Sequence, residues 1–264
     1  MQFKQWISYV GIGLLATTFA ISSQAEIWSS TEVHYSDGDL LNPFIGKDES
    51  ATIITLQHAG GHKYGDNFFF VDHTRTKNTK TEFYGEWYSN FSLGAITGND
   101  MSFGPVKDVG IIAGLNFATA VDSMWVLPGV RLALDLPGFA FANLDMTYYN
   151  HLTTSTMSDE EKSSYMVDFN WAYPFKIGGT SWSLKGHMEY IGGRDVFDSS
   201  GNKKAVGKED WFLAQPQLHL DLGEALGGQA GNLFVGIEYQ YWQNKLGVKD
   251  QDESTVQLQT VWNF

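Results

Sequence analysis

Cysteine is absent from the 264 residues of this chain. Small exported domains often depend on disulfides for their stability, so this absence excludes a disulfide-stapled scaffold. If the chain is exported, its fold must be held by a packed core or by closure of its own backbone hydrogen bonding.

Long apolar stretches are missing beyond the first 25 residues, where no window offers about 18 uninterrupted apolar residues. A bundle of transmembrane helices is therefore excluded. Two classes remain, a soluble protein and a β-barrel that crosses a membrane with strands of alternating polarity.

Basic charge is scarce, with 17 Lys and Arg against 30 Asp and Glu and a formal net charge of −13. Nucleic-acid binding needs a basic face that neutralises phosphates. The charge balance therefore argues against a nucleic-acid partner.

The amino-terminal segment has the features of an export signal. Lys4 supplies a positive charge, residues 7–21 are mostly apolar, and residues 23–25 (Ser-Gln-Ala) fit a small-x-small cleavage site. A transmembrane anchor is the alternative, but the apolar run is shorter than the roughly 20 residues that a spanning helix needs. We expect residues 1–25 to be a cleaved signal peptide, and residues 26–264 to form one mature domain.

Glycine and aromatic residues are abundant, with 28 Gly, 9 Trp, 12 Tyr and 18 Phe, while the mean hydropathy is slightly negative. A porin-like barrel has this composition, because its strands alternate lipid-facing apolar residues with interior polar ones. A soluble β-sandwich would share the glycines but not usually so many aromatics.

The carboxyl-terminal segment alternates with a period of two, which favours the barrel. One face carries Val256, Leu258, Thr260, Trp262 and the terminal Phe264, and the other carries Gln257, Gln259 and Asn263, with Val261 as the exception. A final outward aromatic resembles the recognition signal of outer-membrane barrels, so we expect the barrel-assembly machinery to engage the strand that ends at Phe264. An edge strand of a sandwich is the alternative.

Twelve segments of alternating polarity bounded by Gly, Asn, Asp and Pro predict an all-β, twelve-stranded antiparallel transmembrane β-barrel. They are residues 28–35, 51–59, 66–74, 81–91, 109–117, 124–135, 139–149, 164–173, 181–191, 211–221, 232–242 and 254–264. An even number places both ends on the periplasmic side.

The connections predict which loops face outward. Longer, more charged connections are expected outside at residues 36–50, 150–163, 192–210 and 243–253. The connection at residues 92–108 is long although it falls on the periplasmic side, and the sequence leaves open whether it enters the pore.

The polar faces of the strands predict an acidic interior that repels anions and admits cations or neutral solutes. Its expected members are Glu32, Asp66, Asp72, Glu82, Glu86, Asp135, Asp145, Asp168, Glu189, Asp221 and Glu238, with Arg131, Lys185, His34, His187 and His219. Two ion pairs along single strands are expected, Arg131 with Asp135 and Lys185 with Glu189. The alternative for any one charge is that it only solvates the inner wall.

Interior aromatics give the candidate binding site, because an inner wall has no hydrophobic need for them. The aromatic slot comprises Phe68, Phe70 and Asp72 on one strand and Glu82, Tyr84, Glu86 and Tyr88 on the next. A nucleobase stacks on such rings, and carboxylates accept hydrogen bonds from ribose hydroxyls and amines. Arg131 and Asp145 complete the candidate substrate-binding set. The alternative is that residues 68–70 form an interface girdle.

Catalysis is not indicated. No Gly-x-Ser-x-Gly motif and no zinc-binding helix spacing occurs among the seven histidines. The acidic segments 198–202 and 249–253 offer ligands for a weakly held divalent ion, although solvated loops are the simpler interpretation. We expect no enzyme activity, no cofactor and no resident metal.

One segment resembles a known family. It consists of residues 97–100 (Thr-Gly-Asn-Asp) followed by residues 102–107 (Ser-Phe-Gly-Pro-Val-Lys). This segment is similar to the LTxxDLSFGPxK stretch of the Tsx-like nucleoside-specific outer-membrane channels, which include OmpK-type proteins. Further segments are similar to the same family: the aromatic strand at residues 63–72, the turns at residues 136–138 and 173–175, and the final Trp-Asn-Phe. The resemblance implies a monomeric twelve-stranded barrel that passes nucleosides, and some relatives are bacteriophage receptors.

The start of the mature chain departs from the better-known nucleoside channels, since residues 27–30 replace a longer Trp-rich lead. The expected function is passive diffusion of nucleosides or similar small neutral solutes across the outer membrane. The alternative is a surface-exposed structural or phage-receptor barrel with little selective transport.

Overall fold

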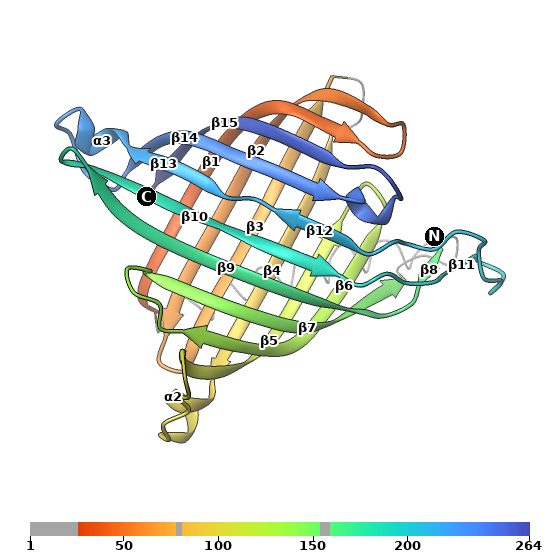
Figure 1. Ribbon diagram of the computed structural model, residues 1–264, viewed down its shortest axis with the longest axis horizontal. Coiled ribbons are helices and arrows are strands. Elements are labelled where there is room, and N and C mark those ends of the chain that lie inside the picture. The colour runs from red at the N-terminus through yellow and green to blue at the C-terminus, as the bar shows by residue number, and fades with distance from the viewer. Residues whose placement is uncertain (1–25, 78–80, 154–158) are drawn as a thin grey trace, which may run out of the picture.

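The computed structural model describes residues 26–77, 81–153 and 159–264 (Figure 1). The expected signal peptide, residues 1–25, lies outside the described residues, as does part of the expected outer loop at 150–163.

The described residues form a closed antiparallel barrel, as predicted. In chain order its strands are β1 (Glu26–Asn42), β2 (Lys47–His62), β3 (Gly65–Thr76), β4 (Glu82–Ser92), β5 (Val106–Ala118), β6 (Ser123–Leu134), β7 (Phe141–Thr153), β9 (Ser164–Ile177), β10 (Thr180–Ile191), β12 (Trp211–Ala214), β13 (Gln217–Asp221), β14 (Leu233–Gln243) and β15 (Glu253–Asn263). Apart from β12 and β13, which both pair with β10 and β14, each strand pairs with its neighbours in this order, and the β1–β15 pairing closes the sheet. Because β12 and β13 are two parts of one strand, the wall has twelve crossings, confirming the prediction.

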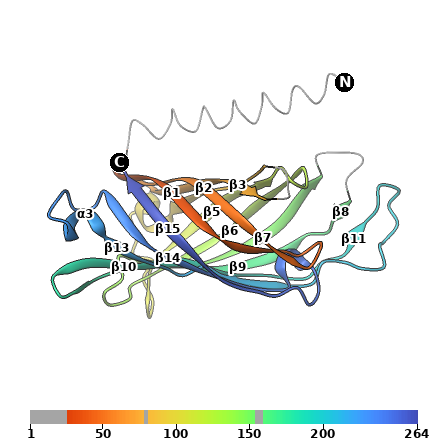
Figure 2. The same ribbon diagram turned by 90° about the horizontal axis from the view of Figure 1, so that it is seen from above.

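Figures 1 and 2 show the front and back of the sheet crossing at an angle, which is the strand tilt that barrel closure requires. In the described part of the chain, no helix is long and apolar enough to cross a membrane.

The alternation predicted for the final strand is present in β15. Val256, Leu258 and Trp262 are 54%, 68% and 47% exposed on the outside, whereas Gln257 and Gln259 are buried inside. An apolar exterior and a polar interior are the arrangement of a barrel in lipid, where every backbone group is paired within the closed sheet.

The tenth crossing is interrupted between β12 and β13 at Gln215 and Pro216. Proline has no N–H for a sheet hydrogen bond, so a regular strand cannot continue through it. The backbone is satisfied locally: the Gln215 N–H donates to the carbonyl of His187 at 2.9 Å, and the Pro216 carbonyl accepts from Tyr239 at 3.0 Å. Gly186 lies opposite with φ 149°, and a Cβ there would be 2.3 Å from the Gln215 oxygen.

The two ends of the barrel differ in their connections. The short-turn end carries α2 (Leu93–Thr97) and α3 (Leu222–Ala225), and the long-loop end carries the small β8–β11 sheet (Glu160–Glu161 with Val196–Phe197) and the 3₁₀ helix η1 (Lys245–Gly247). In outer-membrane barrels the longer loops face the medium.

The expected outer loop at residues 36–50 is mostly strand, which corrects the prediction. β1 and β2 stay paired up to Asn42 and Lys47, with only residues 43–46 between them. Two strands of a hairpin can pair through their backbones without an apolar face. The polar residues that suggested a loop therefore lengthen β1 and β2.

Residues 92–108 form a capped turn at the short-turn end of the barrel. Ser92 caps α2 by accepting from the Ala95 N–H, and Asp108 accepts from the Ser92 hydroxyl at 2.5 Å and from the Gly94 N–H at 3.1 Å. Figure 1 shows α2 projecting beyond the wall. The helix α2 therefore lies outside the wall, while Ser92 and Asp108 at its base line a cavity at this end.

Candidate functional site

The residues of the aromatic slot lie together on the interior face of β3 and β4. Register places Phe68 opposite Tyr88, Phe70 opposite Glu86 and Asp72 opposite Tyr84. Directly opposed residues share one face of a sheet. The ring centroids of Phe68 and Phe70 are 6.0 Å apart, and those of Phe70 and Tyr84 are 5.9 Å apart.

Hydrogen bonds fix the polar members of the slot. The Tyr84 hydroxyl donates to Glu86, and the Asn116 amide donates to the same carboxylate at 2.9 Å. The Tyr88 hydroxyl donates to the Asn116 oxygen at 3.0 Å, and Asp72 accepts from Thr55 at 2.5 Å. The two tyrosines are thereby held in fixed orientations. Glu82 lies on the same face, opposite Thr74 near the end of the hairpin.

Arg131 pairs across strands, which corrects the expected pair with Asp135. Its Nε and Nη2 donate to the two oxygens of Asp145 at 2.8 and 2.7 Å, and its Nη1 donates to Asp66 at 2.8 Å. Asp135 is exposed beyond the end of β6. Residues four apart along a strand are about 13 Å apart, whereas directly opposed residues are about 5 Å apart. Two of the candidate binding residues, Arg131 and Asp145, therefore form a fixed bidentate pair.

Lys185 also pairs across the interior rather than with Glu189. Its Nζ lies 2.8 Å from the carboxylate of Glu32, which also contacts His34 at 2.8 Å. Glu189 accepts a hydrogen bond from the indole of Trp211 at 3.4 Å. Both expected single-strand pairs were wrong for the same geometric reason.

Polar side chains fill much of the interior. Gln257 and His219 are 0% and 1% exposed, and Glu238 accepts from the side chains of Gln257 and Gln217 at 2.9 and 2.6 Å. The predicted acidic interior is therefore a network of hydrogen-bonded polar side chains.

Three ligand-type side chains, Asp168, His187 and Glu189, bring donor atoms within 4.8 Å of one another. Both ring nitrogens of His187 already face oxygens, that of Asp168 at 3.0 Å and that of Gln215 at 2.8 Å. The set is thus satisfied by hydrogen bonds within the protein.

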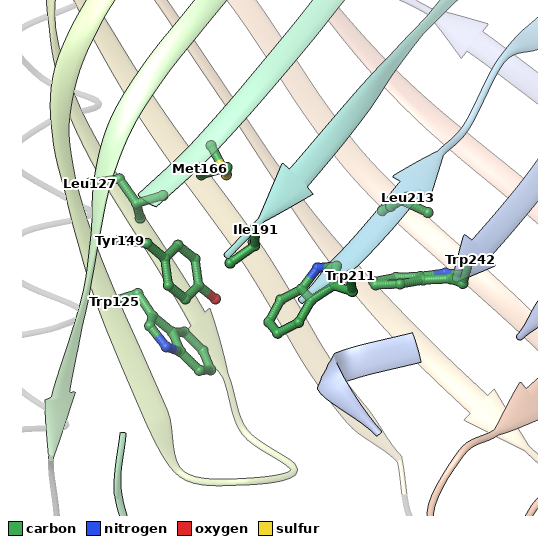
Figure 3. Close-up of a cluster of buried hydrophobic side chains, with 8 residues drawn as sticks. All are labelled: Trp125, Leu127, Tyr149, Met166, Ile191, Trp211, Leu213 and Trp242. Atoms are coloured by element: carbon green, nitrogen blue, oxygen red, sulfur yellow. The ribbon is translucent and has the colours of Figure 1, made fainter. Parts of the chain in front are cut away.

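A second group of interior aromatics lies at the long-loop end and was not predicted. The outer aromatic cluster comprises Trp125, Tyr149, Trp211 and Trp242, packed with Leu127, Met166, Ile191 and Leu213 (Figure 3). The sequence signal that could have revealed it is an apolar run with no alternation, as in residues 211–214 (Trp-Phe-Leu-Ala), because both faces are then apolar.

Arg194 enters this cluster from the segment between β10 and β12. Its guanidinium carbon lies 5.1 Å from the centre of the Tyr149 ring and 4.6 Å from that of Trp211. Its Nε and Nη2 donate to Glu161 at 2.8 and 2.5 Å. Aromatic and ion-paired side chains thus pack together at the long-loop end.

The short-turn end carries a depression of its own. A cavity of about 470 Å³ there is lined by Trp28, Lys63, Asp66, Asn90 and Asp108, among others. Asp66 belongs to both this cavity and the Arg131 pair. The cavity therefore reaches the interior network from the short-turn side.

A closed twelve-stranded barrel with an apolar exterior and a polar interior defines a channel of the outer membrane. Residues 25–263 match the family model described as nucleoside-specific channel-forming protein, Tsx, and the chain belongs to that family. The resemblance seen in the sequence is thereby confirmed.

One curated relative is the outer membrane protein OmpK of Vibrio parahaemolyticus, 26% identical over 129 residues, and the match spans 47% of this chain and 46% of that protein. A solved outer-membrane channel from Pseudomonas putida F1 is similar with a TM-score of 0.53 and 10% identity, over 92% of this chain and 98% of that one. The KdgM porin is similar with a TM-score of 0.46 and 9% identity, over 88% of this chain and 99% of that one. The likeness to the Pseudomonas channel shows the barrel fold.

Proposed function

We propose that this channel passes nucleosides or similar small neutral solutes by passive diffusion, and that the aromatic slot on β3 and β4 binds the base. The observation that carries the proposal is the Phe70–Tyr84 ring pair, 5.9 Å apart on an interior face beside Glu86. A base that stacks on an aromatic ring gains about 1–3 kcal/mol.

The polar neighbours of the rings suit the remaining part of a nucleoside. The carboxylates of Asp72, Glu82 and Glu86 lie on the same interior face as the rings. Ionised carboxylates only accept hydrogen bonds, and ribose hydroxyls and exocyclic amines are donors. The excess of interior carboxylates disfavours anions, so a neutral solute fits better than a nucleotide.

For insertion of the channel, the proposal keeps the expectations from the sequence. We propose export through a signal at residues 1–25, recognition of β15 and Phe264 by the barrel-assembly machinery, and function as a monomer. The β1–β15 pairing closes the barrel within a single chain, so the sheet is completed without a strand from a partner.

A second candidate role is surface attachment, for example by a bacteriophage. The observation that favours it is the β8–β11 sheet, which projects beyond the barrel at the long-loop end (Figure 1). In that case solute preference would be weak.

Ion conductance across planar lipid bilayers separates the two roles. The purified protein is inserted, and nucleosides such as adenosine and thymidine are added in a titration. Concentration-dependent block of the current supports the proposed channel. Conductance that is indifferent to every nucleoside would favour the attachment role and overturn the nucleoside preference.

A further inference from the structure

We propose that the outer wall of the barrel binds one phosphorylated saccharide lipid of the outer leaflet. An acyl chain of this lipid lies in a groove over β14, β15 and β1, and its headgroup contacts Asp37, Thr52 and Arg75. The site faces the membrane and not the interior, so it does not depend on whether nucleosides pass through the channel.

The groove lies on the outer face of three adjacent strands. Its volume is about 490 Å³, and its lining includes Tyr35, Asp37, Val235, Leu258 and Thr260. Register places Val235, Thr260 and Tyr35 in one row across the strands, and places Leu258 beside Asp37 in the next row. Directly opposed residues share one face of a sheet. Because Tyr35 and Leu258 are 48% and 68% exposed, this face is the outside of the barrel.

Asp37 is a charged residue on this apolar outer face. His34 and Ser36 of the same strand are 2% and 4% exposed and point inward, so the alternation of the strand turns Asp37 outward. Its neighbours on the outer face include Tyr35 and Leu258. An ionised side chain that faces lipid is costly unless it has a partner. The position of Asp37 therefore points to a ligand that brings hydrogen-bond donors to the groove.

Thr52 and Arg75 continue the polar row from Asp37 toward β3. Register places Thr52 opposite both Asp37 on β1 and Arg75 on β3. The Thr52 hydroxyl donates to Asp37 at 3.2 Å. Among the described residues, the arginines in ion pairs are Arg131 and Arg194, so the exposed Arg75 keeps its positive charge uncompensated. Two strand spacings, roughly 10 Å, separate Asp37 from Arg75.

Carboxylate, hydroxyl and guanidinium groups in one row match a headgroup that carries both a phosphate and hydrogen-bond donors. The Arg75 guanidinium binds phosphate through charge-assisted hydrogen bonds. The Asp37 carboxylate only accepts hydrogen bonds, so it takes a hydroxyl or an amine. A phosphorylated amino sugar presents these groups on one rigid ring system. A phospholipid headgroup with one phosphate and one amine fills the row less completely.

The place of the row along the wall selects the outer leaflet. β15 begins at Glu253, just after η1 at the long-loop end, and β1 runs antiparallel to β15. β1 and β3 therefore both run toward the long-loop end, and Arg75 is the second-last residue of β3. The row of Asp37 is thus nearer that end than the row of Tyr35. A lipid in this groove has its headgroup toward the medium and its chain toward the membrane centre, as in the outer leaflet.

Native mass spectrometry of the detergent-solubilised protein, titrated with purified lipid A, tests the site. We expect one lipid A per barrel to bind at least about fivefold more tightly than phosphatidylethanolamine. Arg75→Gln should weaken lipid A binding about fivefold, the effect of one basic residue on an anionic lipid. Val235→Trp fills the groove without changing the polar row, and should weaken binding by roughly the same factor. Heat-modifiable migration on gels checks that each variant is folded.

Asp37→Leu separates lipid binding from a structural role. It removes a charge that faces lipid, so its urea midpoint in liposomes without lipid A should equal or exceed that of the wild type, while lipid A binding weakens roughly threefold. Lys249→Gln is the matched control, because it removes an exposed loop cation at the same end and should leave the affinity unchanged. The lipid site is wrong if phosphatidylethanolamine binds as tightly as lipid A, if Arg75→Gln and Asp37→Leu both bind like the wild type, or if Lys249→Gln weakens binding as much as Arg75→Gln.

Discussion

Lys185 of β10 and Glu32 of β1 form an ion pair with Nζ and Oε2 2.8 Å apart, although their strands are four places apart around the barrel. The contact therefore crosses the interior instead of following the wall. Both side chains are mostly buried, at 22% and 13% exposed.

Loss of this crossing contact should destabilise the barrel. Lys185→Gln leaves the Glu32 carboxylate without its cation, and a hydrogen bond to a charged group contributes about 1.5–3 kcal/mol. We expect the urea midpoint of the variant in liposomes to fall accordingly. Lys203→Gln breaks a pair whose side chains are 59% and 51% exposed, and should change the midpoint little. Equal effects of the two variants would contradict a structural role for Lys185.

Removal of a ring from the aromatic slot should weaken nucleoside block. Phe70→Ala or Tyr84→Ala takes away one stacking contact, so block by adenosine should weaken by about 1–3 kcal/mol, with single-channel conductance unchanged or slightly higher. Phe91→Ala is the control on the same hairpin, since Phe91 is 42% exposed on the outer face. Heat-modifiable migration on gels checks that both variants are folded. If adenosine then blocks both variants as tightly as it blocks the wild type, Phe70 and Tyr84 do not belong to the binding site.

Neutralisation of Glu86 should alter ion selectivity rather than stacking. Glu86→Gln removes one interior negative charge while keeping a side chain that can bond Tyr84 and Asn116. The reversal potential in a KCl gradient should shift toward lower cation preference, with nucleoside block mostly retained. Asp250→Asn alters an exposed loop carboxylate and should not shift it. An unchanged reversal potential for Glu86→Gln would place the selectivity elsewhere.

Packing of the long-loop end should strengthen with rising pH. Burial lowers the pKa of Lys208 below its ordinary value of 10.5; Glu161 opposes this shift and Arg194 adds to it. The folded form then releases the Lys208 proton at lower pH than the unfolded form, so stability increases with pH in the window below 10.5. Lys208 also donates to the carbonyl of Leu246 at 3.1 Å, joining two loops.

Resistance of the outer loops to protease between pH 7.5 and 10 measures this effect. Wild type should gain resistance as the pH rises, and Lys208→Met should show a smaller gain, because it no longer holds the proton. Lys204→Met alters a half-exposed lysine paired with Asp159 and should behave like wild type. If protease resistance falls with rising pH in both the wild type and Lys208→Met, the expected stabilisation by loss of the Lys208 proton is wrong.

The segment between β10 and β12 should be accessible on intact cells. Residues 198–202 form a turn in which Asp198 accepts from the N–H groups of Ser200 and Asn202, each at 2.9 Å. An epitope tag inserted after Gly201 should be labelled without permeabilisation. Labelling only after permeabilisation would invert the topology.

Period-two alternation was enough to predict the barrel and the facing of the slot. A one-residue slip in β4 would turn Glu82 and Glu86 toward lipid, which fixes the interior face of Tyr84 and Tyr88 as well. The same reasoning predicted the outer face of β15 through Val256 and Leu258, which are exposed.

Contacts between strands distant in sequence were beyond this reasoning. The partners of Lys185 and Arg131 depend on the tilt and closure of the sheet, which no local pattern encodes. The outer aromatic cluster was missed because apolar residues on both faces hide the alternation at the end of a strand. Arg194 was missed because its position follows from how a loop folds back over the barrel.

The interruption at Pro216 has a consequence for reading related sequences. Gly186 has no side chain, and the space that a Cβ would need is taken by the carbonyl oxygen of Gln215. A homologue with a larger residue in place of Gly186 must therefore also have a different backbone path at positions 215 and 216. Gly186 and Pro216 should therefore vary together. Homologues in which both residues are replaced should have a continuous tenth strand where this chain has the break between β12 and β13.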